Sequence, residues 1–266
     1  MNLIALQYDI AWEDKRANHE KVHSMLAATT SPGDMVVLPE MFATGFSMNV
    51  AAVEEGSERL SELFLASLAR ELQVCIVGGV VTRDGEGRGL NQAVAYGPAG
   101  LLARYTKIHP FTFGNEGEHY AAGGEIVTFQ WQGAQIAPFI CYDLRFPEIF
   151  RHAAVRGAEL MVVIANWPSK RAGHWTTLLQ ARAIENQAYV VGVNRVGTDP
   201  NAGYVGGSTM IDPRGEILAA ADDHETVLRA AFDRSHVHTC REKFPALRDM
   251  RPKFLGENRE TAASRR

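Results

Sequence analysis

The chain has 266 residues, 46% of them hydrophobic, and a formal net charge of −4 at pH 7. This length suits a large α/β layer structure, and charges spread without long runs do not favour nucleic acid or an anionic membrane as partner. No apolar run approaches the ~20 residues that span a bilayer, and the N-terminus has no secretory pattern. Cys75, Cys141 and Cys240 form neither a disulfide framework nor a CxxC metal site. We therefore expect a cytoplasmic protein with reduced thiols.

The first third of the chain alternates strands and helices. Residues 2–8 form an apolar strand, and Asp14 caps the helix that follows. Residues 35–38 form a short buried strand, Ser57 is the expected cap of a second helix, and residues 74–81 form a third strand. The apolar face of the second helix is expected to carry Leu60, Leu63, Phe64, Ser67, Leu68 and Leu72. This order predicts strands covered by helices.

Hairpins interrupt that alternation in the middle of the chain. Strands 92–96 and 101–105 flank the turn signal Gly97-Pro98-Ala99-Gly100. A second hairpin joins residues 127–130 to residues 135–140 through Gln132-Gly133. A purely parallel doubly wound sheet fits these hairpins poorly, so mixed sheets are expected.

A strand-helix order then returns. A helix runs from the turn at Cys141 to about Arg156, and Gly157 stops it. The further elements expected are strand 160–165, helix 174–186, strand 189–194, a hairpin around 212–215 and strand 226–232. Because the sequence contains no linker or low-complexity segment, we predict a single domain over residues 1–256 and a polar C-terminal tail over 257–266.

Cys141 is the first candidate for chemistry. It lies where the apolar run 136–140 gives way to helical spacing, and Pro147 fits only the first turn of that helix. Backbone N–H groups and a helix dipole directed at this position would push a thiol towards thiolate. Read alone, Cys141 is equally well explained as a small buried hydrophobic residue.

Four further candidates are charged residues, two near strand ends and two in a loop. Glu40 follows a short apolar strand, where a carboxylate among apolar neighbours suits general acid–base work. Lys107 ends a hairpin strand among aromatic residues and, facing inward, would stabilise an oxyanion. Glu116 and Glu118 lie in a glycine-broken loop of the kind that often carries function. Each taken singly is more often a solvated surface charge.

Several other chemistries lack their motifs. The chain has no HExxH pair, no GxSxG elbow and no Walker loop, so neither a zinc site nor these other motif-bearing sites are expected. The glycine pairs Gly78-Gly79 and Gly206-Gly207 are best explained by close backbone packing.

Three segments taken in order carry a resemblance: Pro39-Glu40-Met41-Phe42, Tyr105-Thr106-Lys107-Ile108-His109 and the run 141–148, Cys-Tyr-Asp-Leu-Arg-Phe-Pro-Glu. Together they resemble the nitrilase, or carbon–nitrogen hydrolase, superfamily, over residues from the first strand to about 255. The blocks at 165–168, 181–187 and 206–208 look like further family motifs. Within the family, the chain is most similar to the omega-amidase branch, which hydrolyses the terminal amide of 2-oxoglutaramate and 2-oxosuccinamate.

The resemblance implies an α/β fold, a four-layer α-β-β-α sandwich of the nitrilase type with mixed sheets. It also implies a Glu-Lys-Cys triad: Glu40 as general base, Lys107 for the oxyanion and Cys141 as nucleophile. Glu116 matches the family's second glutamate better than Glu118. Family members need no metal or organic cofactor and commonly dimerise through helices near the nucleophile, so a homodimer acting on a small-molecule amide is expected.

The substrate-binding residues expected beside the triad are Tyr142, through its backbone N–H, and Trp167, together with the basic residues Arg145, Lys170 and Arg171. One of the three cations would bind the far carboxylate of a dicarboxylate monoamide; the alternative is that they are surface charges or, for Arg145, part of a structural ion pair. Cleavage of an N-carbamoyl group or another aliphatic amide stays open. So does a catalytically silent subunit with the same fold, which the presence of Glu40, Lys107 and Cys141 disfavours.

Overall fold

A computed structural model describes residues 1–26 and 29–254, and its core is two six-stranded sheets packed face to face. The first sheet has the order β14-β1-β2-β3-β4-β5. Its strands are β1 (Asn2–Gln7), β2 (Met35–Val37), β3 (Cys75–Arg83), β4 (Gly89–Gly97), β5 (Gly100–Thr106) and β14 (Thr226–Ala231). The three central strands β1, β2 and β3 are parallel, whereas β14, β4 and β5 pair antiparallel.

The second sheet repeats this plan, with the order β13-β12-β9-β8-β7-β6. Its strands are β6 (Phe129–Trp131), β7 (Ala134–Ile140), β8 (Leu160–Ile164), β9 (Tyr189–Val193), β12 (Thr209–Ile211) and β13 (Ile217–Ala220). Strands β7, β8 and β9 are parallel, and the outer strands again pair antiparallel. Parallel neighbours place their carboxyl ends at one edge of a sheet, where ligand sites commonly form.

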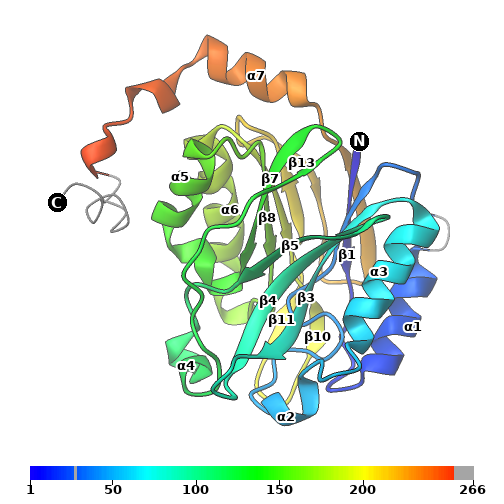
Figure 1. The fold of residues 1–266 in the computed structure, drawn as a ribbon. Coiled ribbons are helices and arrows are strands. Elements are labelled where there is room, and N and C mark those ends of the chain that lie inside the picture. Colours follow the sequence, from blue (N-terminus) through cyan, green and yellow to red (C-terminus); the bar gives the residue numbers. More distant parts are fainter. Residues whose placement is uncertain (27–28, 255–266) are drawn as a thin grey trace.

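Helices cover the outer face of each sheet, which completes four layers (Figure 1). Helices α1 (Lys15–Leu26) and α3 (Leu60–Leu72) lie over the first sheet, and α5 (Pro147–Val155) and α6 (Ala172–Asn186) lie over the second. One apolar cluster fills the space between the sheets and extends under α5 and α6, and a second one packs beneath α1 and α3. The predicted α-β-β-α sandwich with mixed sheets is confirmed.

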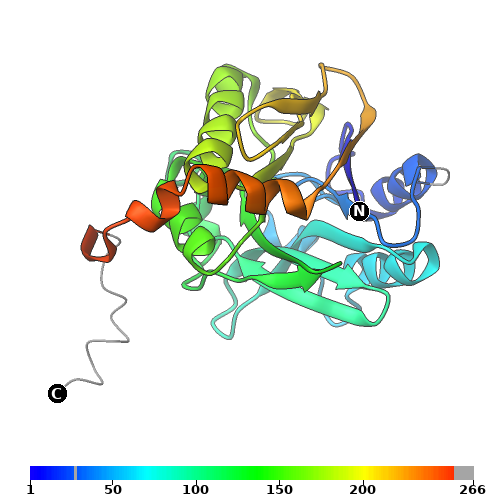
Figure 2. The ribbon, with the colours of Figure 1, turned by 90° about the horizontal axis from the view of Figure 1, so that it is seen from above.

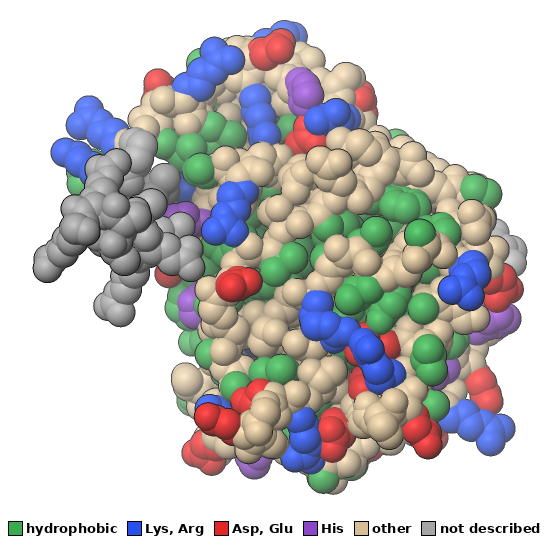
Figure 3. Space-filling view, viewed as in Figure 1, with side chains coloured by type: hydrophobic (Ala, Val, Ile, Leu, Met, Phe, Trp, Pro, Cys, Tyr) green, Lys and Arg blue, Asp and Glu red, His purple; other side chains and the backbone are tan. Residues whose placement is uncertain are grey.

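Smaller elements complete the described chain. They are α2 (Val50–Val53), α4 (Glu116–His119), α7 (Arg234–Lys243), the ribbon β10 (Val196–Thr198) and β11 (Gly203–Val205), and the 3₁₀ segments η1 (Thr112–Gly114), η2 (Cys141–Arg145), η3 (Ser169–Arg171), η4 (Ala246–Asp249) and η5 (Pro252–Phe254). Helix α7 crosses one end of the molecule, where Arg241 contacts residues that precede β8 and β9 of the second sheet (Figure 2). On the face drawn in Figure 3, positive and negative side chains are interspersed. Among the described residues, none of the helices combines the length and apolarity needed to cross a bilayer.

The predicted helix and strand order is largely confirmed, including both mid-chain hairpins. The predicted cap of α3 was wrong. Ser57 is exposed, and Oε2 of Glu55 instead accepts from the backbone N–H groups of Ser61 and Glu62. The prediction of the apolar face of α3 was also partly wrong, because Leu60 and Leu63 are 50% and 62% exposed. Helices α2, α4 and α7 and the β10–β11 ribbon were not predicted, and α4 lies where a loop was expected. The predicted tail, residues 257–266, lies outside the described residues.

Candidate active site

Cys141 begins η2, directly after β7, and its backbone is strained. Its φ is +46°, in the left-handed region that residues other than glycine seldom adopt. Its side chain is 9% exposed, and Sγ lies 3.9 Å from the carbonyl oxygen of Asn166. Asn166 follows β8, the parallel neighbour of β7, so the ends of both strands meet beside the thiol.

The thiol is held in its protonated form. Burial raises the pKa of Cys141 well above its ordinary value, and the negative charge of Glu40 adds to this more than the Lys107 ammonium offsets it. The expected push towards thiolate was therefore wrong in direction. A five-residue 3₁₀ segment follows Cys141, and α5 begins only at Pro147. The helix dipole therefore does not begin at Cys141, and burial is the largest influence on the pKa of its thiol.

Glu40 reaches the same place from the first sheet. It follows β2 and is fully buried. Its turn is pressed against Gly79 on β3: a Cβ atom there would stand 2.3 Å from the Met41 nitrogen and 2.7 Å from the Glu40 Cα. Close packing at this glycine pair is confirmed, and it positions a candidate catalytic residue. The backbone N–H of Asn166 donates to Glu40 Oε2 at 2.8 Å.

Lys107 and Glu116 complete a buried charged cluster. Lys107 Nζ donates to Glu40 Oε1 at 3.0 Å and to Glu116 Oε2 at 2.8 Å. Burial alone would lower the pKa of Lys107, but the charges of Glu116 and Glu40 outweigh it and hold that pKa well above its usual value. Glu118 is exposed, so between the two loop glutamates it is Glu116 that contacts the lysine.

Sequence reasoning missed three residues that shape the site. Asn91 on β4 donates to both Glu40 and Glu116. Asn166 binds Glu40 and was quoted only as part of a family motif. Asp143 is fully buried, and its carboxylate accepts from the Tyr105 hydroxyl and from the backbone N–H groups of His109 and Ile140. Asn166 was detectable, because it follows a buried strand as Cys141 does; Asn91, inside a strand, gave no such signal.

A pocket of about 520 Å³ opens above the thiol. All five predicted substrate-binding residues line it together with Cys141, namely Tyr142, Arg145, Trp167, Lys170 and Arg171. The Arg145 guanidinium lies 4.8 Å from the Trp167 ring centroid, and Arg171 lies 5.2 Å from that of Phe111. Lys170 is exposed. Within residues 1–26 and 29–254, no carboxylate lies within 4.0 Å of the charged nitrogens of these three cations. The pocket is therefore rich in unpaired positive charge.

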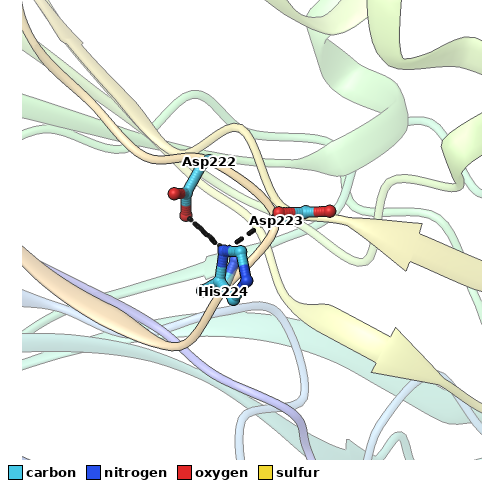
Figure 4. A group of neighbouring side chains, drawn as sticks. All are labelled: Asp222, Asp223 and His224. Carbon is cyan, nitrogen blue, oxygen red and sulfur yellow. Dashed lines mark hydrogen bonds and ion pairs between the residues drawn. The ribbon is translucent and has the colours of Figure 1, made fainter.

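Among the described residues, one group of side chains that could hold a metal ion lies away from this pocket, in the loop between β13 and β14 (Figure 4). His224 Nδ1 lies 3.2 Å from Asp222 Oδ1 and 3.0 Å from Asp223 Oδ1. All three residues are exposed. Their approach is accounted for by hydrogen bonding and ion pairing among themselves, and we assign no metal to them.

Comparison with known proteins places the chain in a family. A sequence model of carbon–nitrogen hydrolases matches residues 3–242. The chain is 39% identical to the omega-amidase YafV of Escherichia coli strain K12, covering 94% of this chain and 96% of that protein. It is 33% identical to the 2-oxoglutaramate amidase of Bacillus subtilis strain 168, covering 92% and 96%.

Solved structures agree with this placement. XC1258 of Xanthomonas campestris, a CN-hydrolase superfamily protein with an arsenic adduct in its active site, superposes with a TM-score of 0.88 at 35% identity, covering 94% of this chain and 97% of that one. Saccharomyces cerevisiae Nit3, of the nitrilase superfamily, gives a TM-score of 0.82 at 26% identity, covering 92% and 94%. The chain belongs to the carbon–nitrogen hydrolase family.

Proposed function

We propose that this protein is an omega-amidase, which hydrolyses the terminal amide of 2-oxoglutaramate or 2-oxosuccinamate to the dicarboxylic acid and ammonia. The observation that carries the proposal is the strained Cys141 beside the buried Glu40, Lys107 and Glu116, at the floor of a pocket with unpaired cations. The named activities of relatives at 33–40% identity support the same substrate class.

The first half of the reaction forms a thioester. Because the Cys141 thiol is protonated at rest, Glu40 takes its proton as Sγ attacks the amide carbon. The tetrahedral oxyanion is stabilised by the Lys107 ammonium and the backbone N–H of Tyr142. Glu40 then gives the proton to the departing nitrogen, the C–N bond breaks and ammonia leaves.

The second half hydrolyses that thioester. Glu40, ionised again, takes a proton from a water molecule that attacks the carbonyl carbon. The C–S bond breaks, the thiol of Cys141 recovers the proton, and the acid product leaves. Glu116 acts through Lys107: its carboxylate accepts from Nζ at 2.8 Å, which fixes the ammonium for the oxyanion.

We assign the far carboxylate of the substrate to Arg145. Its guanidinium lies against the Trp167 ring on the pocket wall, and Nη2 is 3.2 Å from His174 Nδ1, so the side chain is held in place. A guanidinium that is fixed and partly buried binds a carboxylate better than the exposed Lys170 ammonium. Arg171 stacks beside Phe111 and Phe113 and is the second candidate.

The deciding experiment measures ammonia release from 2-oxoglutaramate, succinamate and a neutral aliphatic amide, for wild type, Cys141→Ala and Glu40→Gln. Fast release from the oxo-acid amide by wild type alone supports the proposal. Equal release from the neutral amide would reject the carboxylate specificity and favour a general amidase. No release from any of them, with N-carbamoyl substrates also inert, would leave a non-catalytic subunit of the same fold.

We further propose a cytoplasmic homodimer that needs no metal or organic cofactor and binds neither nucleic acid nor membranes. The dimer would form through α5 and α6, where Val155 and Ile184 are 53% and 54% exposed. Light scattering measures the mass of the purified protein and so tests the dimer. The double variant Val155→Asp, Ile184→Asp is expected to have the mass of a monomer. A wild-type monomer would reject it.

A further inference from the structure

Asn91, on β4, binds both glutamates of the buried cluster. Its side-chain Nδ2 donates to Glu40 Oε1 at 2.8 Å and to Glu116 Oε1 at 2.9 Å. Its backbone carbonyl accepts from the N–H of Lys107 at 2.9 Å. The residue is 1% exposed. One asparagine therefore contacts all three charged members of the site.

The direction of this amide follows from the charges around it. Asn91 Oδ1 is buried without a hydrogen-bond partner. Reversing the amide would point that oxygen at two carboxylates and remove a donor from each of them, which costs more than one unpaired oxygen. The site thus tolerates an unsatisfied buried atom so that the NH₂ group faces Glu40 and Glu116.

The site needs such donors because its charges do not balance. Two carboxylates and one ammonium, all buried, leave a net charge of −1 beside Cys141. Tyr120 is also buried near both glutamates, and it is uncharged. Its hydroxyl donates to the Ser47 carbonyl and so is not used to stabilise either carboxylate. Hydrogen bonds to a buried carboxylate favour its ionised form.

We propose that Asn91 is a positioning residue that holds the Glu40 carboxylate directed at the thiol, and that the pH dependence of catalysis depends on its two hydrogen bonds. This inference rests on the roles of Glu40 and Cys141 in the proposed function. It assigns to Asn91 no contact with substrate.

The test is the pH dependence of Asn91→Leu, which removes the donor and keeps a side chain of similar size. The acid limb of kcat/KM is expected to move up by about one to two pH units, because a hydrogen bond to a charged group is lost. KM should change little. Asn91→Ala gives the same measurement if the leucine variant does not fold, since truncation adds no bulk.

Asn186→Leu is the matched control. Asn186 is also fully buried, donates one side-chain hydrogen bond to the Arg182 carbonyl and leaves its own Oδ1 unpartnered. It lies on α6, away from the carboxylates, so its variant is expected to keep the wild-type acid limb. A folded Asn91 variant with a wild-type acid limb, or an equal shift in Asn186→Leu, would overturn the proposal.

A second readout separates this inference from the proposed function. Alkylation of Cys141 by iodoacetamide needs the base but no substrate, and its pH dependence should move with Asn91→Leu as kcat/KM does. If wild type cleaves no amide, the alkylation profile still tests Asn91. An alkylation profile unchanged by Asn91→Leu would reject the role of Asn91 even in an active enzyme.

Discussion

Asn166 donates to Glu40 from two sides: its backbone N–H to Oε2 at 2.8 Å and its side-chain amide to the Glu40 carbonyl at 2.7 Å. Asn166 follows β8 of the second sheet, whereas Glu40 follows β2 of the first. Cys141 follows β7, next to β8. This pair of hydrogen bonds therefore holds the proposed base from one sheet beside the proposed nucleophile from the other.

Asn166→Ala should therefore damage both catalysis and stability. It leaves the buried Glu40 carbonyl unpaired, which lowers the free energy of unfolding by about 1–3 kcal/mol. A base displaced by about 1 Å should lower kcat by about 10²-fold. Steady-state kinetics and urea unfolding measure the two effects, with Asn201→Ala at the exposed pocket rim as control. Lower stability with unchanged kcat would make Asn166 purely structural.

Glu116 and Glu118 form a matched pair two residues apart. Glu116 is buried on Lys107, whereas Glu118 is exposed. Glu116→Gln removes the charge that fixes the ammonium and should lower kcat by up to about 10²-fold. Glu118→Gln should leave kcat unchanged. Equal kcat values for the two variants would show that Glu116 has no part in turnover.

Because Cys141 is protonated, the direction in which its alkylation rate changes with pH can be predicted. Its raised pKa means that, at any pH below it, less thiolate is present than for an ordinary thiol. In Glu40→Gln the contribution of the Glu40 charge is lost, but burial, the largest cause of the raised pKa of Cys141, remains, so alkylation of Cys141 should keep rising through pH 9. Wild type, with its base, should react near neutrality. Cys75 should stay inert, since burial raises its pKa and it is fully buried.

Iodoacetamide labelling in a Cys240→Ser background, followed by mass spectrometry, makes this measurement without interference from the partly exposed third thiol. A plateau below pH 8 in Glu40→Gln would show that Cys141 is a thiolate without the base. The helix-dipole expectation would then stand after all.

Much of the fold was predictable because its signals are local. The hairpin at Gly97–Gly100 and the stop at Gly157 depend on turn chemistry within a few residues, and both occur. Helix α7 escaped prediction because only Val237 among its residues is buried, so it has almost no apolar face to detect. Apart from Val237, which belongs to the apolar cluster between the sheets, its contacts include polar ones, such as the hydrogen bond from Arg241 to the Ala158 carbonyl.

The candidate site was predictable only where motifs mark it. Glu40, Lys107 and Cys141 are far apart in the chain, and their meeting depends on how two sheets face each other, which no local pattern encodes. Asn91 shows the limit: an asparagine in a strand has many explanations until the carboxylates opposite it are known.

Glu55 offers a test of stability away from the site. Its Oε2 caps α3 by accepting from the N–H groups of Ser61 and Glu62. Glu55→Ala should lower the free energy of unfolding by about 1–2 kcal/mol, as loss of a helix cap does, whereas Ser57→Ala should have little effect. Urea denaturation measures both. Lys15→Ala removes the ion pair to Glu55 together with the hydrogen bond from Nζ to the Glu54 carbonyl, so its effect sets an upper limit on the contribution of that ion pair. A larger loss in Ser57→Ala would restore Ser57 as the cap.

Arg145 decides how the pocket selects its substrate. Arg145→Gln removes the proposed partner of the substrate carboxylate and keeps much of the side-chain length. Because a hydrogen-bonded charge pair contributes about 1.5–3 kcal/mol, KM for 2-oxoglutaramate should rise by about 10- to 100-fold. KM for a neutral aliphatic amide should not rise, because that substrate has no carboxylate to lose contact with. Lys170→Gln, at an exposed position of the same pocket, is the control and should change neither value. If Lys170→Gln or Arg171→Gln gave the selective rise instead, the carboxylate would lie against that residue; an equal rise for both substrates in Arg145→Gln would mean that Arg145 supports the pocket wall beside Trp167 without binding charge.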